Sequence, residues 1–226
     1  MVNERVDRLR RESLDAKPFV STERAELMTE YYRQNTDLGS EPMRRAQAFR
    51  HLMEHKTVYI GPDELIVGEK GPAPKATPTF PELCCHSLQD LEILSSRENI
   101  PFAVSPEARQ IQRETIVPFW HGKSMRDLLF QEMTEEWKAA YEAGIFTEFM
   151  EQRAPGHTVL DSKINHKGLA DLKQDIQLSL LTLDYLDDSE AYQKRQELEA
   201  MLICADAMMR FAERHADKAR ELAQQE

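Results

Sequence analysis

The sequence predicts a mainly α-helical protein with a few short strands. Apolar residues recur at helical spacing through most of the 226 residues, and only eight glycines interrupt them. Serine, threonine and proline stand at the positions where helices are expected to begin. The composition, 41% hydrophobic and 31% charged, is typical of a folded globular protein and excludes a disordered one.

Three helices are expected in the first quarter of the chain. The first ends before Pro18, because a proline disfavours helical geometry in the residue that precedes it. The second begins after Ser21 or Thr22, either of which can cap it. The third covers about 42–55 and starts with a proline in its first turn.

The pattern then changes from helical to β-prone. Residues 57–60 and 65–67 are rich in β-branched and aromatic side chains, and the Gly-Pro-Asp sequence at 61–63 signals a turn between them. These segments predict two short strands. Residues 71–78 contain three prolines and predict an ordered loop across the surface.

Helix-capping residues mark four further helix starts. They are Ser87, Ser105, Ser124 and Thr134. The helix that begins at Ser105 has a proline in its first turn and is expected to run to Trp120.

Two longer helices are expected at the end of the chain, over 163–186 and from Ser189 to Glu226. The second contains no glycine or proline, and its apolar stripe continues almost to the last residue. A stripe without a C-terminal cap predicts that more protein follows and that the stripe is exposed in this chain. Its central residues are Leu198, Leu202, Ala205 and Met209.

Charge and composition limit the classes of partner and compartment. A net charge of -11 argues against a nucleic-acid-binding protein, which needs clustered basic residues. No apolar run approaches the roughly 20 residues of a membrane span, and the N-terminus lacks the apolar stretch of a signal peptide. Three cysteines do not describe a disulfide framework. We therefore expect a cytoplasmic protein that binds neither nucleic acid nor membrane.

Two clusters have residue types that bind metals. Cys84, Cys85 and His86 are adjacent, although two thiolates that share one zinc are usually two to four residues apart; the alternative is small, buried residues near a helix start. His51 and His55 lie four residues apart on one helical face without a third ligand nearby, and the alternative is a solvated face. We predict no metal. The same two histidines, with His121, His166 and His215, are expected at the surface.

The segment EQRAPGHTV, residues 151–159, interrupts the helical pattern. Pro155 and Gly156 predict a type II turn, which needs a positive φ at the glycine. His157 follows this turn, and Phe146 and Phe149 precede it. A histidine beside aromatic residues on an irregular backbone can hydrogen-bond a small polar substrate in a dry pocket. The alternative is a histidine that satisfies backbone groups of its own loop.

Four segments carry a resemblance to a known family. They are residues 64–70 (ELIVGEK), 81–86 (PELCCH), 141–149 (YEAGIFTEF) and 151–159. On these motifs the sequence resembles the glycyl radical enzymes of the pyruvate formate-lyase superfamily, over essentially all of 1–226. Within the superfamily it is most similar to the trans-4-hydroxy-L-proline dehydratases and to the proteins labelled pyruvate formate-lyase 2.

The resemblance implies a fold and a cofactor. Family members have a ten-stranded α/β barrel with helices outside it, and residues 1–226 would be the N-terminal helical part of this domain. A cysteine that becomes a thiyl radical and a glycine that stores the radical lie on two loops of the barrel. Both loop motifs are absent from this chain, and Cys84 and Cys85 match a different family segment. The glycyl radical is therefore expected on a glycine outside the chain.

The resemblance also implies roles for two residues. In the dehydratases, the position that matches His157 hydrogen-bonds near the leaving hydroxyl, and the position that matches Phe149 packs against the substrate. We therefore predict that His157 is catalytic and that Phe149 and His157 bind the substrate. Loss of water from a small hydroxylated molecule, trans-4-hydroxy-L-proline, is the expected reaction of the full-length enzyme; this chain alone is expected to be inactive.

The expected partners are a radical S-adenosylmethionine activating enzyme and, at full length, a second copy in a homodimer. Two alternatives remain open. One is another glycyl radical enzyme, such as a glycerol or diol dehydratase or a C–C lyase that resembles formate C-acetyltransferase. The other is a non-catalytic helical interaction module.

Overall fold

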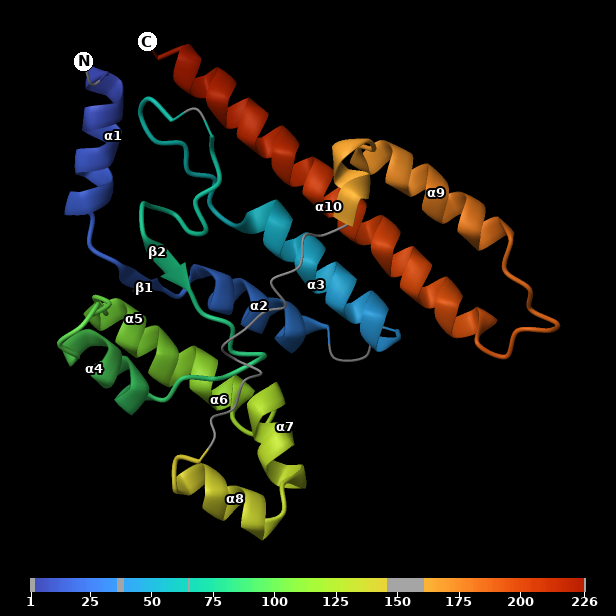
Figure 1. Ribbon diagram of the computed structural model, residues 1–226, viewed down its shortest axis with the longest axis horizontal. Helices are drawn as coiled ribbons and strands as arrows, with labels where there is room; N and C mark the ends of the chain where they lie inside the picture. Colours follow the sequence, from blue (N-terminus) through green and yellow to red (C-terminus); the bar gives the residue numbers. More distant parts are fainter. Residues whose placement is uncertain (1–2, 36–38, 65, 146–160, 226) are drawn as a thin grey trace. The chain divides into compact units, whose positions relative to one another are not determined.

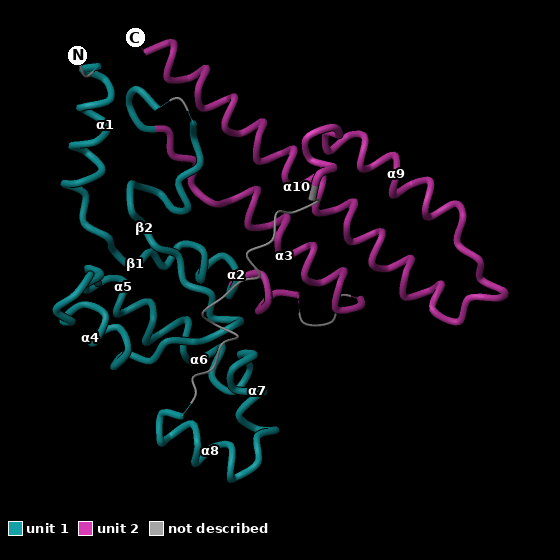
Figure 2. The backbone as a smooth tube through the Cα atoms, viewed as in Figure 1, with its two compact units in different colours: residues 1–29, 61–156 teal, residues 30–60, 157–226 magenta. Residues whose placement is uncertain are grey.

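The chain is mainly helical, as the sequence predicts (Figure 1). The computed structural model describes residues 3–35, 39–64, 66–145 and 161–225. The chain divides into two compact units (Figure 2): unit 1 comprises residues 1–29 and 61–156, and unit 2 comprises residues 30–60 and 157–226. No helix among the described residues is both long enough and apolar enough to cross a bilayer.

Unit 1 is built from short helices and two strands. Its elements are α1 (Glu4–Asp15), β1 (Phe19–Ser21), the first part of α2 (Glu23–Gln34), β2 (Ala76–Pro78), α4 (Leu88–Ser96), α5 (Pro106–Ile111), α6 (Val117–Trp120), α7 (Met125–Glu132) and α8 (Glu135–Glu142). The four predicted caps are confirmed, because the side chains of Ser87, Ser105, Ser124 and Thr134 each accept a hydrogen bond from a first-turn backbone N–H. At Ser87 and Ser124 the third helical residue is an aspartate that completes a capping box.

The predicted helix from Ser105 to Trp120 is confirmed, but its middle is wider than an α-helix. A π-helical segment, Gln112–Ile116, joins α5 to α6, and the N–H of Val117 donates to the carbonyl of Gln112 five residues earlier. Pro118 follows directly. In α geometry its ring would press against the carbonyl of Glu114 and leave that carbonyl without a donor. The wider turn is placed where the proline makes an α-helix costly.

The strands form at other positions than the sequence predicts. Residues 57–60 and 66–67 are irregular, while β1 and β2 pair in parallel with Phe19 opposite Ala76. Strand propensity depends on a pairing strand, and in the described residues neither β-prone segment is paired in a sheet. The loop predicted over 71–78 ends in β2. Gly71 is buried there, and a Cβ on it would lie 2.6 Å from the Cβ of Ala76.

The core of unit 1 contains a buried polar link between Trp120 and Thr29. The Trp120 Nε1–H donates to Thr29 Oγ1 at 2.8 Å, and that hydroxyl donates to the Ala25 carbonyl at 2.6 Å. Thr29 and Ala25 are fully buried and Trp120 is nearly so. The indole is therefore packed in the core while its one polar atom has an acceptor.

Unit 2 is a set of long helices. It contains the end of α2, α3 (Glu41–His55), a short 3-10 helix (Asp161–Asn165), α9 (Leu169–Leu181) and α10 (Ala191–Ala223). Helix α10 packs along α3 and against α9. The packed surfaces include small residues, and those that are buried are Ala46, Ala48, Ala191, Ala200, Ala205 and Ala207. Small side chains allow helix axes to approach closely.

A cation of α10 holds the end of α3. Arg214 donates to the carbonyls of Met53 (2.6 Å) and Lys56 (2.7 Å), which have no partner within the helix. Positive charge at the C-terminus of a helix also interacts favourably with the helix dipole. The ammonium of Lys56 in turn lies 5.0 Å from the centre of the Phe211 ring.

Two predictions about the last helices were wrong in detail. The helix predicted over 163–186 is a 3-10 turn followed by α9, because Gly168 takes an extended conformation and the Asp171 carboxylate accepts from its N–H. The stripe predicted to be exposed on α10 is largely covered: Ala205 is buried, and Leu198, Leu202 and Met209 are half-buried. Packing against α3 and α9 covers a stripe that the sequence alone leaves without a partner.

Candidate functional site

The residues predicted to meet the substrate, Phe149 and His157, lie outside the described residues. The same holds for Phe146, Pro155 and Gly156, so the type II turn also stays a prediction. What the structure describes is the helix that enters this segment, α8, and the helical turn that leaves it, Asp161–Asn165.

Helix α8 ends with a glycine cap just before this segment. Gly144 has φ +72°, its N–H donates to the carbonyl of Tyr141, and the N–H of Ile145 donates to the carbonyl of Ala140. This pair of hydrogen bonds is a Schellman motif, which satisfies the last carbonyls of a helix and turns the chain sharply. The backbone at Gly144 and Ile145 therefore defines where α8 ends.

An aromatic and cationic cluster holds α8 against α7. Arg126 donates to the Tyr141 hydroxyl at 3.1 Å, and its guanidinium lies 4.4 Å from the centre of the Phe130 ring. Phe130 and Tyr141 meet edge to face at 4.8 Å. Backbone N–H groups of Met125 and Arg126 donate to Glu82 and Leu83, which places this pair of helices beside the segment Pro81–His86.

The adjacent cysteines are both half-buried, and Cys85 is packed rather than reactive. Cys84 and Cys85 are half-buried, and burial, followed by the charges of Asp127 and Asp90, raises the pKa of the Cys85 thiol to about 11. The Gln112 side chain lies against Cys85 and donates to the His86 carbonyl at 2.6 Å. A thiol with such a pKa is protonated at neutral pH and is a poor nucleophile or metal ligand. Across the described ranges, no three His, Cys, Asp or Glu side chains lie together as a metal site.

His51 is not the surface residue that the sequence predicts. Its ring lies 4.3 Å from that of His55 and 5.7 Å from that of Tyr31, centre to centre. Burial, and then the charge of His55, lowers the pKa of His51, while Glu30 and Glu54 act in the opposite direction. His51 Nε2 and the Tyr31 hydroxyl are buried atoms without a hydrogen-bond partner among the described residues.

Of the other four histidines, three are exposed as predicted and one is not. His121 and His166 are exposed, as is His55, whereas His215 is half-buried and its Nδ1 lies 2.9 Å from the Phe211 carbonyl. The sequence signal that would have found His51 is its i, i+3 relation to the buried residue Ala48 on α3. A position on the packed side of an amphipathic helix is less exposed than its polar residue type suggests.

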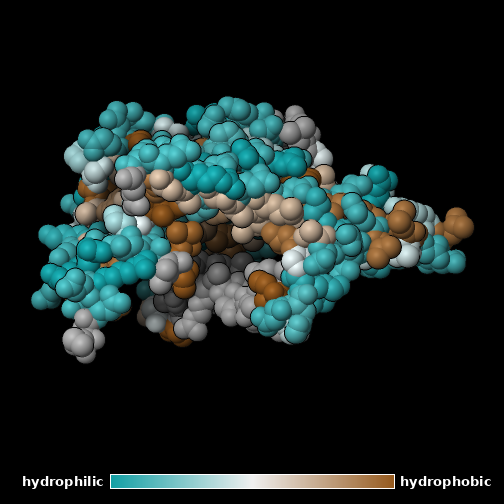
Figure 3. All heavy atoms as spheres, turned by 90° about the horizontal axis from the view of Figure 1, so that it is seen from above, coloured by the Kyte–Doolittle hydropathy of each residue, from teal (hydrophilic) through white to brown (hydrophobic). Residues whose placement is uncertain are grey.

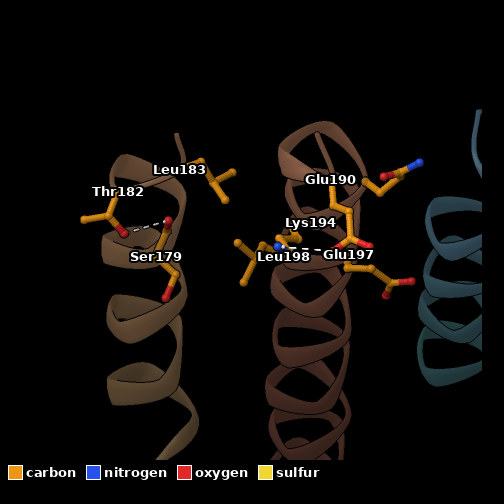
Figure 4. Close-up of a pocket in the computed structure, with 8 residues that line it drawn as sticks. Ser179, Thr182, Leu183, Glu190, Lys194, Glu197 and Leu198 are labelled. Carbon is orange, nitrogen blue, oxygen red and sulfur yellow. Dashed lines mark hydrogen bonds and ion pairs between the residues drawn. The ribbon is translucent and has the colours of Figure 1, made fainter. Parts of the chain in front are cut away.

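Two open grooves occur among the described residues. One, of about 760 Å³, lies between the end of α9 and the start of α10 (Figure 4), with Leu183 and Leu198 pointing into it. Lys194 lies on the rim of this groove, and hydrogen bonds to Asp188 and Glu190 raise its pKa. Its ammonium is therefore charged and already has acceptors. The Ser179 and Thr182 hydroxyls in this groove donate to backbone carbonyls, so its side chains offer contacts rather than an activated nucleophile.

The second groove, of about 530 Å³ in unit 1, is lined by parts of 64–70 and by Lys75, Ala76 and Thr77. The Lys75 ammonium donates to the Ala16 carbonyl at 2.8 Å, and the Glu64 carboxylate accepts from the Gly61 N–H at 3.0 Å. Both charged groups therefore fix the backbone. Neither groove contains a residue that was predicted to act on a substrate.

Comparison with known proteins gives consistent relatives. The chain is 52% identical over 223 residues to trans-4-hydroxy-L-proline dehydratase of Clostridioides difficile, covering 99% of this chain and 28% of that protein. The crystal structure of hydroxyproline dehydratase from the same organism, with trans-4-hydroxy-L-proline bound, matches with a TM-score of 0.94 and 51% identity over 100% of this chain and 29% of that one.

A solved structure of the B12-independent glycerol dehydratase of Clostridium butyricum, with glycerol bound, is more distant. It matches with a TM-score of 0.88 and 28% identity, over 99% of this chain and 28% of that one. The chain thus spans less than a third of the length of these relatives. The family model described as pyruvate formate lyase-like matches all of residues 1–226, and the chain belongs to this family.

Proposed function

We propose that the chain is the N-terminal part of a glycyl radical dehydratase that removes water from trans-4-hydroxy-L-proline. The observation that supports this most strongly is the 52% identity to a dehydratase of that substrate, which extends over 99% of the chain. The same fold, at a TM-score of 0.94, occurs in a solved dehydratase that holds this substrate. The identity to the glycerol dehydratase is much lower, at 28%.

The radical chemistry in this proposal comes from outside the chain. A glycyl radical, stored on a glycine elsewhere in the enzyme, would supply the radical chemistry that removes a hydrogen atom beside the C–O bond. Cys84 and Cys85 are not assigned to the thiyl position, because they lie in the PELCCH segment and Cys85 is packed against Gln112. The contribution of residues 1–226 is to bind substrate and to stabilise the departing hydroxyl.

His157 is the residue to which we assign the second task. An imidazole that donates a hydrogen bond to the leaving oxygen stabilises the charge that develops there and lowers the barrier. Phe149 would form an apolar wall beside the substrate and keep water and oxygen from the radical. The Schellman cap at Gly144 and the α7–α8 cluster fix the end of α8, the described helix that precedes both residues in the sequence.

The proposal includes the partners that this chemistry needs. A radical S-adenosylmethionine activating enzyme would generate the glycyl radical, and the full-length enzyme would be a homodimer. Because carbon-centred radicals react with oxygen, the enzyme would work under anaerobic conditions, and we place it in the cytoplasm.

The test uses the longer protein, loaded with the radical by its activating enzyme. Turnover per glycyl radical, counted by electron paramagnetic resonance, is measured on trans-4-hydroxy-L-proline, glycerol and 1,2-propanediol. We expect turnover on hydroxyproline to exceed turnover on either diol by at least about tenfold, which corresponds to about 1.4 kcal/mol of transition-state discrimination. Faster turnover of glycerol would favour a diol dehydratase, the second candidate, whose solved representative also matches this chain.

A measurement of the length of the natural chain could also overturn the enzymatic proposal. Intact-mass analysis of the natural polypeptide gives its length independently of activity. If it ended at Glu226, the chain could not carry the radical loops and would be a helical interaction module.

A further inference from the structure

Helix α9 is apolar on two opposite sides. Leu172 and Ile176 are buried on the side that packs in unit 2, whereas Leu178 and Leu181 are 60% and 82% exposed. At 100° per residue, Leu178 and Leu181 lie on the side of α9 away from Leu172 and Ile176. A helix in water carries one apolar stripe, and a helix with apolar side chains on both sides is covered on both.

The exposed apolar residues continue around the end of the α9–α10 hairpin. Leu186 in the connection is 95% exposed, and Tyr185 and Tyr192 are 54% and 64% exposed. In Figure 3 apolar residues gather at the right of the view, where Figure 1 shows this hairpin end. Exposed apolar side chains that gather on one part of a surface indicate a contact site. We call Leu178, Leu181, Tyr185, Leu186 and Tyr192 the hairpin face.

A groove adds depth to this end of the hairpin. It is the space of about 760 Å³ between α9 and α10, with Leu183 and Leu198 inside it and Glu190 and Glu197 among its lining residues (Figure 4). The Glu190 carboxylate shares Lys194 with Asp188, and no ion pair of Glu197 occurs among the described residues. An occupant with apolar anchors and basic flanking residues would complement both features.

We propose that the hairpin face and its groove are the docking surface for the part of a longer protein that lies outside residues 1–226. The inference rests on the proposed function, in which this chain is one part of such a protein. Its support is the length of the relatives: the matched region is 28% of the dehydratase sequence and 29% of the solved dehydratase chain. Helix α9 is already packed on its other side. The remaining part of a longer protein would therefore cover its exposed apolar side.

Charge disfavours a second copy of the same surface as the occupant. Asp184, Asp187, Asp188 and Glu190 all lie in or next to the connection, and Lys194 neutralises only part of this charge. In a two-fold contact the same patch meets itself, so these carboxylates would face one another. Juxtaposed like charges oppose association.

Thiol labelling tests the proposal without any need for activity. Leu181→Cys and Leu186→Cys are made in the 226-residue chain and in the longer protein. Peptide mass spectrometry then measures the rate of maleimide labelling at each position. We expect both positions to be labelled at least tenfold more slowly in the longer protein. Glu213→Cys, at a side chain that is 64% exposed and distant along α10, is the control for a general change in reactivity.

Two outcomes would overturn the proposal. Equal labelling rates in the two proteins would show that nothing in the longer chain covers the hairpin face. Protection that disappears on dilution would show that a second copy covers it instead. Because the readout requires no radical, protection in a longer protein without dehydratase activity would reject the proposed function while leaving this inference intact.

Discussion

At the scale of single residues, the burial of His51 predicts that the stability of the fold depends on pH. Burial, and then the charge of His55, lowers its pKa, and its Nε2 has no hydrogen-bond partner among the described residues. The folded state therefore binds the proton less well than the unfolded state, whose histidine has a pKa of about 6.5. The stability contributed by neutral His51 is complete above the pKa of the unfolded state. It is lost as pH falls below that pKa, because the unfolded state takes up the proton first.

We therefore expect the free energy of unfolding to fall more between pH 7.5 and pH 5.5 in the parent chain than in His51→Gln. Urea unfolding at the two pH values measures the difference. His166→Gln, at an exposed position, should keep the pH dependence of the parent. If His51→Gln also kept it, the titration of His51 would not be coupled to folding.

The buried link between Trp120 and Thr29 gives a second residue-scale prediction. Thr29→Val conserves shape but removes the acceptor of the indole N–H in a fully buried position. Loss of a buried partner costs about 1–3 kcal/mol, and we expect a destabilisation in that range by chemical denaturation. Thr182→Val, at an exposed threonine, should change stability by less than about 0.5 kcal/mol.

At the scale of elements, the alanines of α10 determine how closely it can pack. Ala200 is 6% exposed, whereas Ala212 on the same helix faces solvent. Ala200→Leu inserts a larger side chain into a packed contact, and we expect a cost of about 1–3 kcal/mol. Ala212→Leu has the same change in helix propensity without the contact, so its effect should stay within about 0.5 kcal/mol. Equal effects at both positions would contradict the packing described for α10.

The end of α8 supports another element-scale prediction. Gly144 has φ +72° and an added Cβ would meet no atom within 4 Å, so a substitution there acts through backbone strain alone. Gly144→Ala should cost about 1 kcal/mol, and Gly144→Asn should cost less because asparagine tolerates this conformation. Thermal unfolding of the two variants measures the order, and a larger cost for asparagine would exclude the left-handed cap.

The elements show which parts of the fold the sequence can predict. Caps at Ser87, Ser105, Ser124 and Thr134 were predictable, because a cap depends on residues within one turn. The pairing of Phe19–Ser21 with Ala76–Pro78 was not, because it joins segments far apart in the chain and neither segment has a strong strand pattern. The covered stripe of α10 was missed for the same reason: its pattern shows that a partner is needed, but α3 and α9 are identified only by the folded structure.

At the scale of the whole molecule, the proposed function would depend on residues from different parts of a longer chain. His157 and Phe149 were proposed from a local sequence motif and a family resemblance, and periodicity alone left His157 open to a structural role. Composition excluded classes of function, such as nucleic-acid binding, but it contained no information about a radical reaction. Only relatives of known activity connect this helical region to dehydration.

The last prediction separates the two proposed roles in the full-length, radical-loaded enzyme. His157→Gln should leave glycyl radical formation unchanged, because that step depends on the radical loop and the activating enzyme. It should lower turnover per radical on the true substrate by about 10²- to 10⁴-fold if the imidazole assists departure of the hydroxyl. If the histidine only positions substrate, glutamine should recover much of the rate, and the loss should appear in KM rather than in kcat.

Phe149→Ala is the matched variant on the same segment: it should weaken substrate binding and shorten the lifetime of the radical, because it opens an apolar wall. Unchanged turnover in His157→Gln would assign the histidine to its own loop, and radical loss in that variant but not in Phe149→Ala would reverse the roles proposed for the two side chains.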